Sequence, residues 1–565
     1  MRGRSLIAAL AGAALVLLLA ALALPPAFAQ DLPAAEEVDE PNAGGPEPAA
    51  QPSATDPSAE PAAPPADAAA GTEAASPQEA AAPPPDATPI VASVRAKLAD
   101  PATRKDAPAG DLTALEKFYN SRGDPVWMTD MGFSREAQSA IDEIHKADDW
   151  GLSSAAFALP SAGDLPDTVD DQALGEIKLN LAILKYARHA RGGRTDPDKL
   201  KNVDMTPTFR DPDRLLAEIA AAPAPNDYLR SLHPQHEQFK RLHQALLKAR
   251  AESEAGAKPR NMQKLLVNME RWRWMPEDLG TLYVQINIPE YMVYIGKNGN
   301  VIHKEKVVVG KPVYATPIFS ADLKSIVFNP EWTVPSTIIR EDLLPRLRRG
   351  GGMFGGGTSI LKQHKLNVNY KGKRVDPSSI DWNRVNMGAI SFTQAPGPTN
   401  VLGKVKFLYP NRHSVYMHDT IKRELLTREV RVEGHHCPRV ANPGKVAALI
   451  LAEDKGMPAS EIDKLLANGY NSAVYLNGRV PVHTTYFTAA VDADGKVRNF
   501  ADVYNLDAGV AAAVFGKEAK AEAVADNAEV TAPEVKPKPP TPPKPARTDS
   551  TASTPQAAGF GIAAP

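Results

Sequence analysis

Between residues 110 and 255 the apolar positions recur at helical spacing. Leu112 and Leu115 fall on one stripe, and residues 179–186 are apolar at nearly every position, as in a fully buried helix. Proline and glycine interrupt these runs repeatedly, as they do between helices. The pattern predicts an all-helical domain over residues 106–265.

Beyond this helical stretch the period changes. Leu282, Val284 and Ile286 alternate with polar neighbours, which is typical of a strand with one buried face. Further strand-like runs follow, including residues 414–417. A mainly β domain is predicted over residues 268–455.

Residues 340–395 interrupt this β pattern. A charged helix is predicted from Arg340 to Arg349, and a cluster of six glycines follows within residues 350–357. The cluster lacks the Lys-Ser/Thr that completes a phosphate-binding loop, so a hinge or lid is the better interpretation.

A C-terminal piece, residues 456–515, is expected to add a helix and a strand over Thr484–Val491 that pack on one of the two domains. The predicted fold class is therefore α+β, a helical domain followed by a mainly β domain.

The two flanking segments lack any such period. Residues 31–105 consist largely of Ala, Pro, Glu and Asp, and residues 516–565 form a Lys/Pro-rich tail. Such segments bury too little apolar surface to offset their chain entropy, so both are predicted to be disordered.

Residues 1–30 have the pattern of a secretory signal peptide. Arg2 and Arg4 precede a long apolar run, and Ala27-Phe28-Ala29 offers a cleavage site. The alternative is an uncleaved anchor, which would be the chain's one membrane contact. Either way the chain is expected to be exported.

The charge balance points to no polyanionic partner for the chain as a whole. There are 64 basic and 67 acidic residues, a net charge of −3. No global positive field favours nucleic acid, which is not expected as a partner.

Cys437 is the one cysteine of the chain, so it cannot form an internal disulfide. An inert buried residue, an intermolecular pair, a metal ligand and a reactive thiol remain open. His435 and His436 adjoin it, and His418 ends a strand in which alternation places Tyr416 on the same face. An imidazole there could activate the thiol and later protonate a leaving amine.

A zinc site is the rival interpretation of the same residues. Cys437 could combine with His413, His418, His435 or His436, although the side chains of adjacent histidines diverge and rarely share one ion.

Several motifs together carry a family resemblance. They are Arg191-Gly192-Gly193-Arg194-Thr195-Asp196-Pro197, Asn268-Met269-Glu270-Arg271-Trp272-Arg273-Trp274-Met275-Pro276, Phe328-Asn329-Pro330-Glu331-Trp332, Leu402-Gly403-Lys404-Val405-Lys406-Phe407, His418-Asp419-Thr420 and Cys437-x-Arg439-Val440. In these motifs the chain resembles the L,D-transpeptidase (YkuD-type) family, large Gram-negative periplasmic type, over residues 110–515.

The resemblance implies a helical scaffold domain and a β-rich catalytic domain with a lid insertion. It implies a periplasmic enzyme whose cysteine forms a thioester with a peptidoglycan tetrapeptide stem, releases D-alanine and passes the acyl group to an amine, giving a 3→3 cross-link. No metal or organic cofactor is implied. The partners would be peptidoglycan stem peptides, or a lysine of an outer-membrane protein as the alternative acceptor.

Residue by residue, Cys437 matches the family's nucleophile and His418 its general base. The supporting positions are a pocket residue near the base, a histidine two before the cysteine, an arginine after it and a residue of the substrate channel. They match Tyr416, His435, Arg439 and Trp332, respectively.

The sequence departs from the family around the nucleophile. His436 replaces a glycine that could be needed for a positive φ, and Pro438 removes a backbone donor. A catalytically impaired homologue that binds the cell wall as a scaffold therefore stays open as an alternative, as does transfer to water.

Overall fold

The computed structural model describes residues 86–105, 107–160, 168–257, 261–349 and 358–516. The predicted signal peptide, most of the predicted N-terminal linker, the glycine cluster and the C-terminal tail lie outside these residues. None of the helices in the described ranges combines the length and apolarity needed to cross a membrane.

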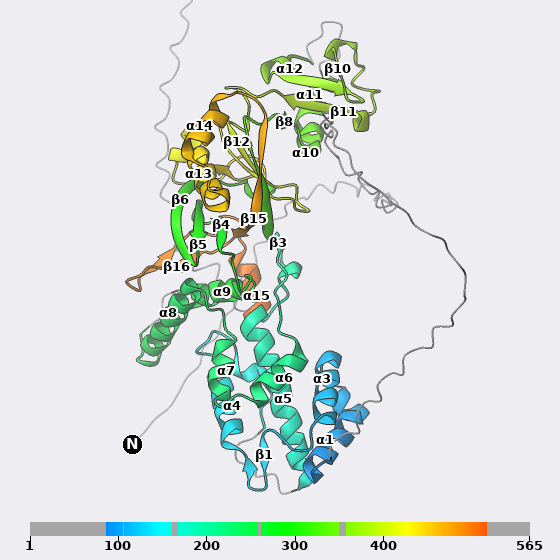
Figure 1. Cartoon of the computed structure of the whole chain (residues 1–565), viewed down its shortest axis with the longest axis vertical. Coiled ribbons are helices and arrows are strands. Elements are labelled where there is room, and N and C mark those ends of the chain that lie inside the picture. The colour runs from blue at the N-terminus through cyan, green and yellow to red at the C-terminus, as the bar shows by residue number, and fades with distance from the viewer. Residues whose placement is uncertain (1–85, 106, 161–167, 258–260, 350–357, 517–565) are drawn as a thin grey trace, which may run out of the picture. The chain divides into compact units, whose positions relative to one another are not determined.

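Helices dominate the first part of the described chain, as the sequence predicts (Figure 1). Their bounds are α1 (Pro89–Ala99), α2 (Pro101–Arg104), α3 (Ala109–Asn120), α4 (Arg135–His145), α5 (Val169–Gly192), α6 (Pro212–Ala220), α7 (Pro225–Ser231) and α8 (Glu237–Glu254). The one hairpin among them joins β1 (Met128–Thr129) to β2 (Gly132–Phe133). Helix α5 is buried along most of its length.

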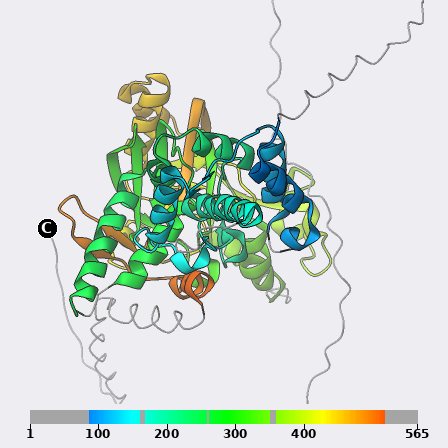
Figure 2. The ribbon, with the colours of Figure 1, turned by 90° about the horizontal axis from the view of Figure 1, so that it is seen from below.

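The boundary predicted for the disordered linker is wrong at its C-terminal end. Residues 89–99 form α1, which lies beside α5 (blue and cyan in Figures 1 and 2). Val91, Val94 and Leu98 are fully buried against this core. Their spacing of three and four residues is a helical stripe that the surrounding Ala/Pro composition obscured.

Helix α9 (Met262–Arg273) follows the helical region and is buried although it carries several charges. Arg271 forms an ion pair of 2.6 Å with Asp507, and both side chains are less than a tenth exposed. Glu270 accepts the backbone N–H of Thr195 at 3.2 Å and lies 3.6 Å from the Arg273 guanidinium. These contacts tie α9 to segments far away in the sequence.

A nine-stranded sheet forms the second part. Its strands are β3 (Val203–Asp204), β4 (Leu282–Asn287), β5 (Met292–Lys297), β6 (Asn300–Val308), β7 (Ile318–Phe328), β12 (Val405–Leu408), β13 (Met417–His418), β14 (Arg439–Val440) and β15 (Ser472–Thr485). The order is β12-β13-β14-β6-β5-β4-β15-β7-β3, and a further β12–β7 pairing closes the sheet on itself.

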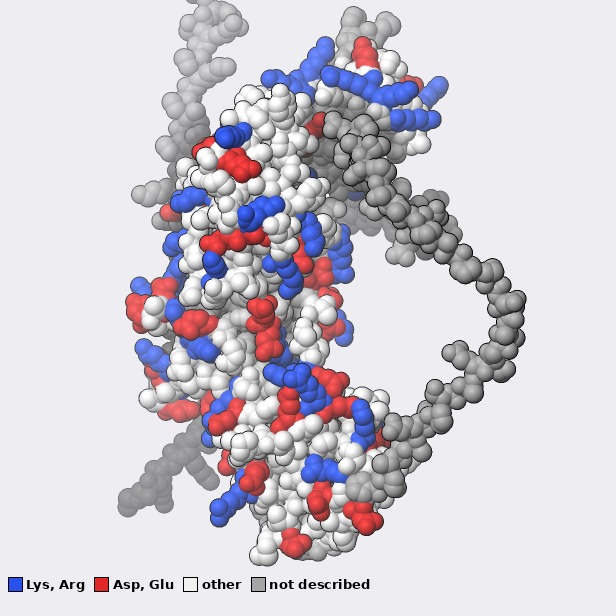
Figure 3. Space-filling view, in the orientation of Figure 1, with Lys and Arg blue, Asp and Glu red and all other residues white. Residues whose placement is uncertain are grey.

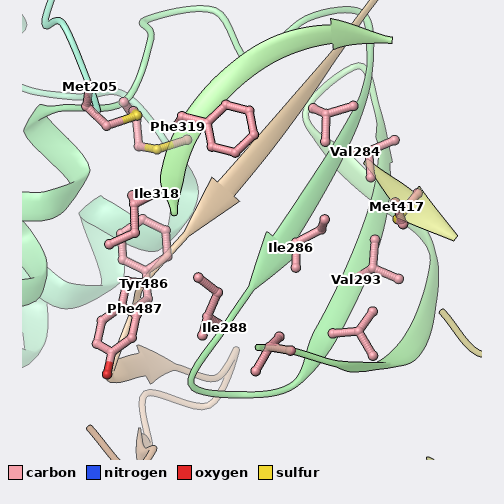
Figure 4. Close-up of a cluster of buried hydrophobic side chains, with 14 of the residues drawn as sticks. Met205, Val284, Ile286, Ile288, Val293, Ile318, Phe319, Met417, Tyr486 and Phe487 are labelled. Carbon is pink, nitrogen blue, oxygen red and sulfur yellow. The ribbon is translucent and has the colours of Figure 1, made fainter. Parts of the chain in front are cut away.

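The alternating apolar side chains meet inside this sheet. Val284, Ile286 and Val293 point toward Met417 and Phe319 in Figure 4, and all five are buried. Packing of these side chains fixes the positions of the strands. The polar residues that alternate with them therefore lie on the other face of the sheet.

The C-terminal piece supplies one strand of the nine-stranded sheet, so the predicted boundary at 455 divides one structural unit. Strand β15 lies between β4 and β7 in this sheet, parallel to β4 and antiparallel to β7. The parallel pairing needs a long crossover, which a local pattern cannot reveal. The piece also holds α14 (Ala459–Ala467), a hairpin of β16 (Ala489–Val491) and β17 (Val497–Asn499), and α15 (Asp507–Phe515), while α13 (Pro443–Lys455) precedes it.

The interruption predicted at 340–395 has its own small sheet and core. The sheet order is β10-β9-β11-β8, with β8 (Trp332–Thr333), β9 (Leu366–Tyr370), β10 (Lys373–Val375) and β11 (Ile390–Gln394). The predicted charged helix comprises a π-helical turn (Ile339–Leu343) and α11 (Leu344–Arg349), preceded by α10 (Ser336–Ile338); α12 (Ser359–Gln363) follows. We call residues 332–395 the insertion.

We expect Arg271→Ala to lower the free energy of unfolding by about 3 kcal/mol, because it leaves the buried Asp507 carboxylate without its ion pair. Arg241→Ala is the matched control: its pair with Glu237 on α8 is largely exposed, so the loss should stay below about 0.5 kcal/mol. Urea unfolding measures both, and equal effects would contradict the role given to α9.

Candidate active site

Strands β13 and β14 run parallel and place His418 directly opposite Arg439. The backbone N–H of His418 donates to the Pro438 carbonyl at 3.0 Å. Val415 and Met417 are buried in the core, whereas Tyr416 and His418 line a cavity on the other side. The two faces predicted for these residues are confirmed, whereas the strand predicted from residue 414 is shorter: β13 begins at Met417, and Ser414 has a φ of 54°.

The cavity has a volume of about 570 Å³. The six residues predicted from the sequence all line it, namely Trp332, Tyr416, His418, His435, Cys437 and Arg439. The structure therefore brings together side chains from β8, β13, β14 and the loop that precedes β14.

The imidazole of His418 is held in one tautomer. Its Nδ1 lies 2.5 Å from the carbonyl oxygen of Asp419, which can only accept, so Nδ1 carries the proton and Nε2 keeps its lone pair. The Asp419 carboxylate accepts the backbone N–H of Thr420 at 2.6 Å and of Lys404 at 2.8 Å, and pairs with Arg423. Asp419 thus holds the local backbone in place, and that backbone orients the ring.

Electrostatics keep both groups neutral at rest. Burial lowers the pKa of His418 to about 3, and the positive charges of Arg439 and Lys406 act in the same direction. Burial raises the pKa of the Cys437 thiol to about 11, opposed by a backbone hydrogen bond from Tyr416 and by the same two cations. The proton therefore stays on sulfur, and in the described structure no hydrogen bond joins Cys437 to His418.

The loop before Cys437 takes its positive φ at Gly434, not at His436. Gly434 has φ of +81°, and a Cβ there would lie 2.1 Å from Arg439 Nη2. The φ of His436 is not positive, so the expectation of backbone strain at this position is wrong. Its carbonyl accepts a hydrogen bond from the Thr316 hydroxyl at 2.7 Å, which braces the loop.

Lys406 is a cavity residue that the sequence analysis missed. It lies on β12 opposite His418, and its Nζ is 4.1 Å from the centre of the Tyr416 ring. Val405 and Phe407 beside it are fully buried, so alternation places Lys406 on the cavity face. That alternation was the available signal.

His413, which the sequence analysis names only as a possible zinc ligand, lies in the cavity wall. Asp204 of β3 lies 2.6 Å from His413 Nε2 and 2.6 Å from an Arg412 guanidinium nitrogen. Both partners line the cavity. A residue from the helical half of the sequence therefore braces the cavity wall.

The described residues contain no group of three or more His, Cys, Asp or Glu side chains arranged to hold a metal ion.

Comparison with known proteins defines the class. Residues 281–455 match the L,D-transpeptidase catalytic domain family, and residues 113–246 match the scaffold domain family. The chain therefore carries an L,D-transpeptidase catalytic domain together with a scaffold domain.

One relative supports the same class. A Haemophilus influenzae protein named "Putative L,D-transpeptidase" is 31% identical over 247 residues, which cover 43% of this chain. The match spans about half (48%) of that protein's length.

The thiol pKa predicts slow alkylation of Cys437 at neutral pH. The rate with iodoacetamide should rise about tenfold per pH unit from pH 7 to 10, because the thiolate is the nucleophile. Lys406→Met should slow alkylation at each pH, since removing this cation raises the thiol pKa. Lys404→Met, an exposed neighbour, should leave the rate unchanged. A rate that levels off below pH 8 would contradict this assignment.

The φ values predict losses of stability of different size for two loop substitutions. Gly434→Ala should cost about 1–2 kcal/mol of stability in backbone strain and displace Arg439. His436→Gly relieves no strain and should cost only about 0.5–1 kcal/mol through added chain entropy. Urea unfolding of the two variants tests this order; a stabilising His436→Gly would refute it.

Proposed function

We propose that this protein is a periplasmic L,D-transpeptidase that acts through a Cys437 thioester on peptidoglycan tetrapeptide stems. One observation carries the proposal. The thiol of Cys437 and the neutral imidazole of His418, whose Nδ1 is fixed by a hydrogen bond, line the same cavity in the region that matches the L,D-transpeptidase catalytic domain. Export is inferred from the signal-like pattern of residues 1–30.

In the first half-reaction, Sγ of Cys437 attacks the carbonyl carbon of the third stem residue. The thiol proton moves to Nε2 of His418 as the C–S bond forms, and the carbonyl oxygen becomes an oxyanion. The imidazolium then protonates the leaving amine, the C–N bond breaks, and D-alanine departs. The thioester remains on Cys437.

In the second half-reaction, an acceptor amine attacks the thioester. His418 takes the amine proton and returns it to sulfur as the C–S bond breaks, so that the thiol and the neutral imidazole are restored. We propose the side-chain amine of a neighbouring stem as acceptor, which yields a 3→3 cross-link. A lysine of an outer-membrane protein would react in the same way.

Arg439 and Lys406 are suited to bind a substrate carboxylate. Neither side chain has an ion pair within 4.0 Å among the described residues, and burial lowers the pKa of each. A carboxylate bound between them would offset the two charges that depress the pKa of His418. Substrate binding would thereby raise the pKa of the imidazole, and also that of the thiol, which the same two cations lower.

Mass spectrometry of the exported chain mixed with purified tetrapeptide muropeptides tests this function. We expect an acyl adduct on Cys437, loss of D-alanine and a cross-linked dimer, and no adduct on Cys437→Ala. His418→Ala should lower turnover at least ~100-fold, as expected for loss of a general base.

His145→Ala, which removes an exposed histidine of α4, is the control and should retain full activity. If the folded protein gives neither adduct nor product, the wall-binding scaffold would replace the enzyme as the proposed function. An adduct that yields only hydrolysed stem would instead make water the acceptor.

A further inference from the structure

The insertion carries a charge opposite in sign to that of the whole chain. Residues 340–395 contain ten Lys and Arg against four Asp and Glu, a net charge of +6, whereas the chain has a net charge of −3. Figure 3 shows these basic side chains gathered over the surface formed by the insertion, where acidic side chains are sparse.

Most of these cations have no acidic partner. All ten are exposed, and the ion pairs recorded among them are Arg340 with Glu341 and Arg384 with Asp381. Of the eight that form no ion pair in the described part of the chain, Arg348 donates to the Trp382 carbonyl at 3.2 Å. We define the basic surface as the other seven. They are Arg346, Arg349, Lys362, Lys365, Lys371, Lys373 and Arg374.

A rigid support holds these like charges close together despite their mutual repulsion. Leu347, Val368 and Phe392 form part of a separate buried core under the insertion. The β9–β10 hairpin pairs Lys373 with Tyr370 and Arg374 with Asn369, so the charges project from an ordered turn. Repulsion destabilises such a surface unless an anion lies against it.

The insertion is continuous with the active-site cavity. Its first strand, β8, pairs with β11, and Trp332 of β8 lines the cavity together with residues 335–338. A ligand held on the basic surface is thereby attached to the same small sheet that forms one wall of the cavity.

We propose that the basic surface binds the carboxylates of peptidoglycan stem peptides on the strand that supplies the acceptor amine. The inference rests on the proposed function, because that function requires a second, acidic strand beside the cavity. Separate lysine and arginine side chains on an open surface suit dispersed carboxylates along a polymer. Binding of this kind raises the local concentration of acceptor and weakens with salt.

The test is co-sedimentation of the full chain with purified peptidoglycan sacculi, in a Cys437→Ala background that prevents turnover. The charge variant combines Lys365→Gln, Lys371→Gln, Lys373→Gln and Arg374→Gln. We expect about tenfold weaker binding than the parent at low salt, and a smaller salt dependence. Sacculi whose carboxylates have been amidated should bind the parent as weakly as native sacculi bind the variant.

A matched variant separates local from overall charge. Lys146→Gln, Lys178→Gln, Lys240→Gln and Lys248→Gln remove four exposed lysines of the helical part, none of which forms an ion pair in the described residues. This control should bind as the parent does. Equal losses in the two variants, or no loss in either, would overturn the inference.

Two further outcomes would assign the surface to another ligand and also overturn the inference. The first is weakened binding of the charge variant to anionic phospholipid vesicles with unchanged binding to sacculi. The second concerns residues 31–85, which contain eleven acidic and no basic residues. If deleting them removes the difference in sacculus binding between the parent and the charge variant, these residues would be the ligand of the basic surface.

Adduct formation with a soluble muropeptide, measured on the same four substitutions with Cys437 intact, should be unchanged. This measurement distinguishes the two proposals. If the charge variant loses sacculus binding but still forms the adduct, only the basic surface is affected. If no adduct forms in either protein, the proposed enzyme activity fails while the binding result still stands.

Discussion

The parallel pairing of β13 with β14 is the constraint on which the candidate site depends. One residue pair, His418 opposite Arg439, sets the register of two very short strands. A slip by one residue would turn His418 into the core and Met417 into the cavity, since side chains alternate along a strand. The full burial of Met417 opposes that slip, so hydrophobic packing on one face positions the chemistry on the other.

Burial of Cys437 and His418 also determines the electrostatics of the site. It favours the neutral forms of both the thiol and the imidazole, while Lys406 and Arg439 favour the thiolate and disfavour the imidazolium. Burial lowers the pKa of both cations, and neither forms an ion pair within 4.0 Å among the described residues, although the Glu433 carboxylate attracts Arg439. In the proposed function a substrate carboxylate would lie against these two cations and raise the pKa of both the imidazole and the thiol.

Two further networks support this arrangement from a distance. Buried charges of α9 connect it to α15 through Arg271 and to the loop after α5 through Glu270. Asp204 of β3 braces the loop that contains Arg412 and His413. Both networks join segments that are more than 70 residues apart in the sequence. The second reaches the cavity itself, because Arg412 and His413 line it.

The sequence by itself determined the two-part α+β organisation, the alternation that turns Tyr416 and His418 to one face, and the six residues that meet in the cavity. The first two features follow from local periodicity, and the cavity residues follow partly from that periodicity and partly from the resemblance to the L,D-transpeptidase family. The sequence did not reveal α1 inside an Ala/Pro-rich segment, the position of β15 between β4 and β7, or the contacts of Lys406 and Asp204 at the cavity. Only the tertiary structure decided these, and it also placed the positive φ at Gly434 rather than His436. Each depends on pairing, burial or charge contacts between distant residues, which no local pattern records.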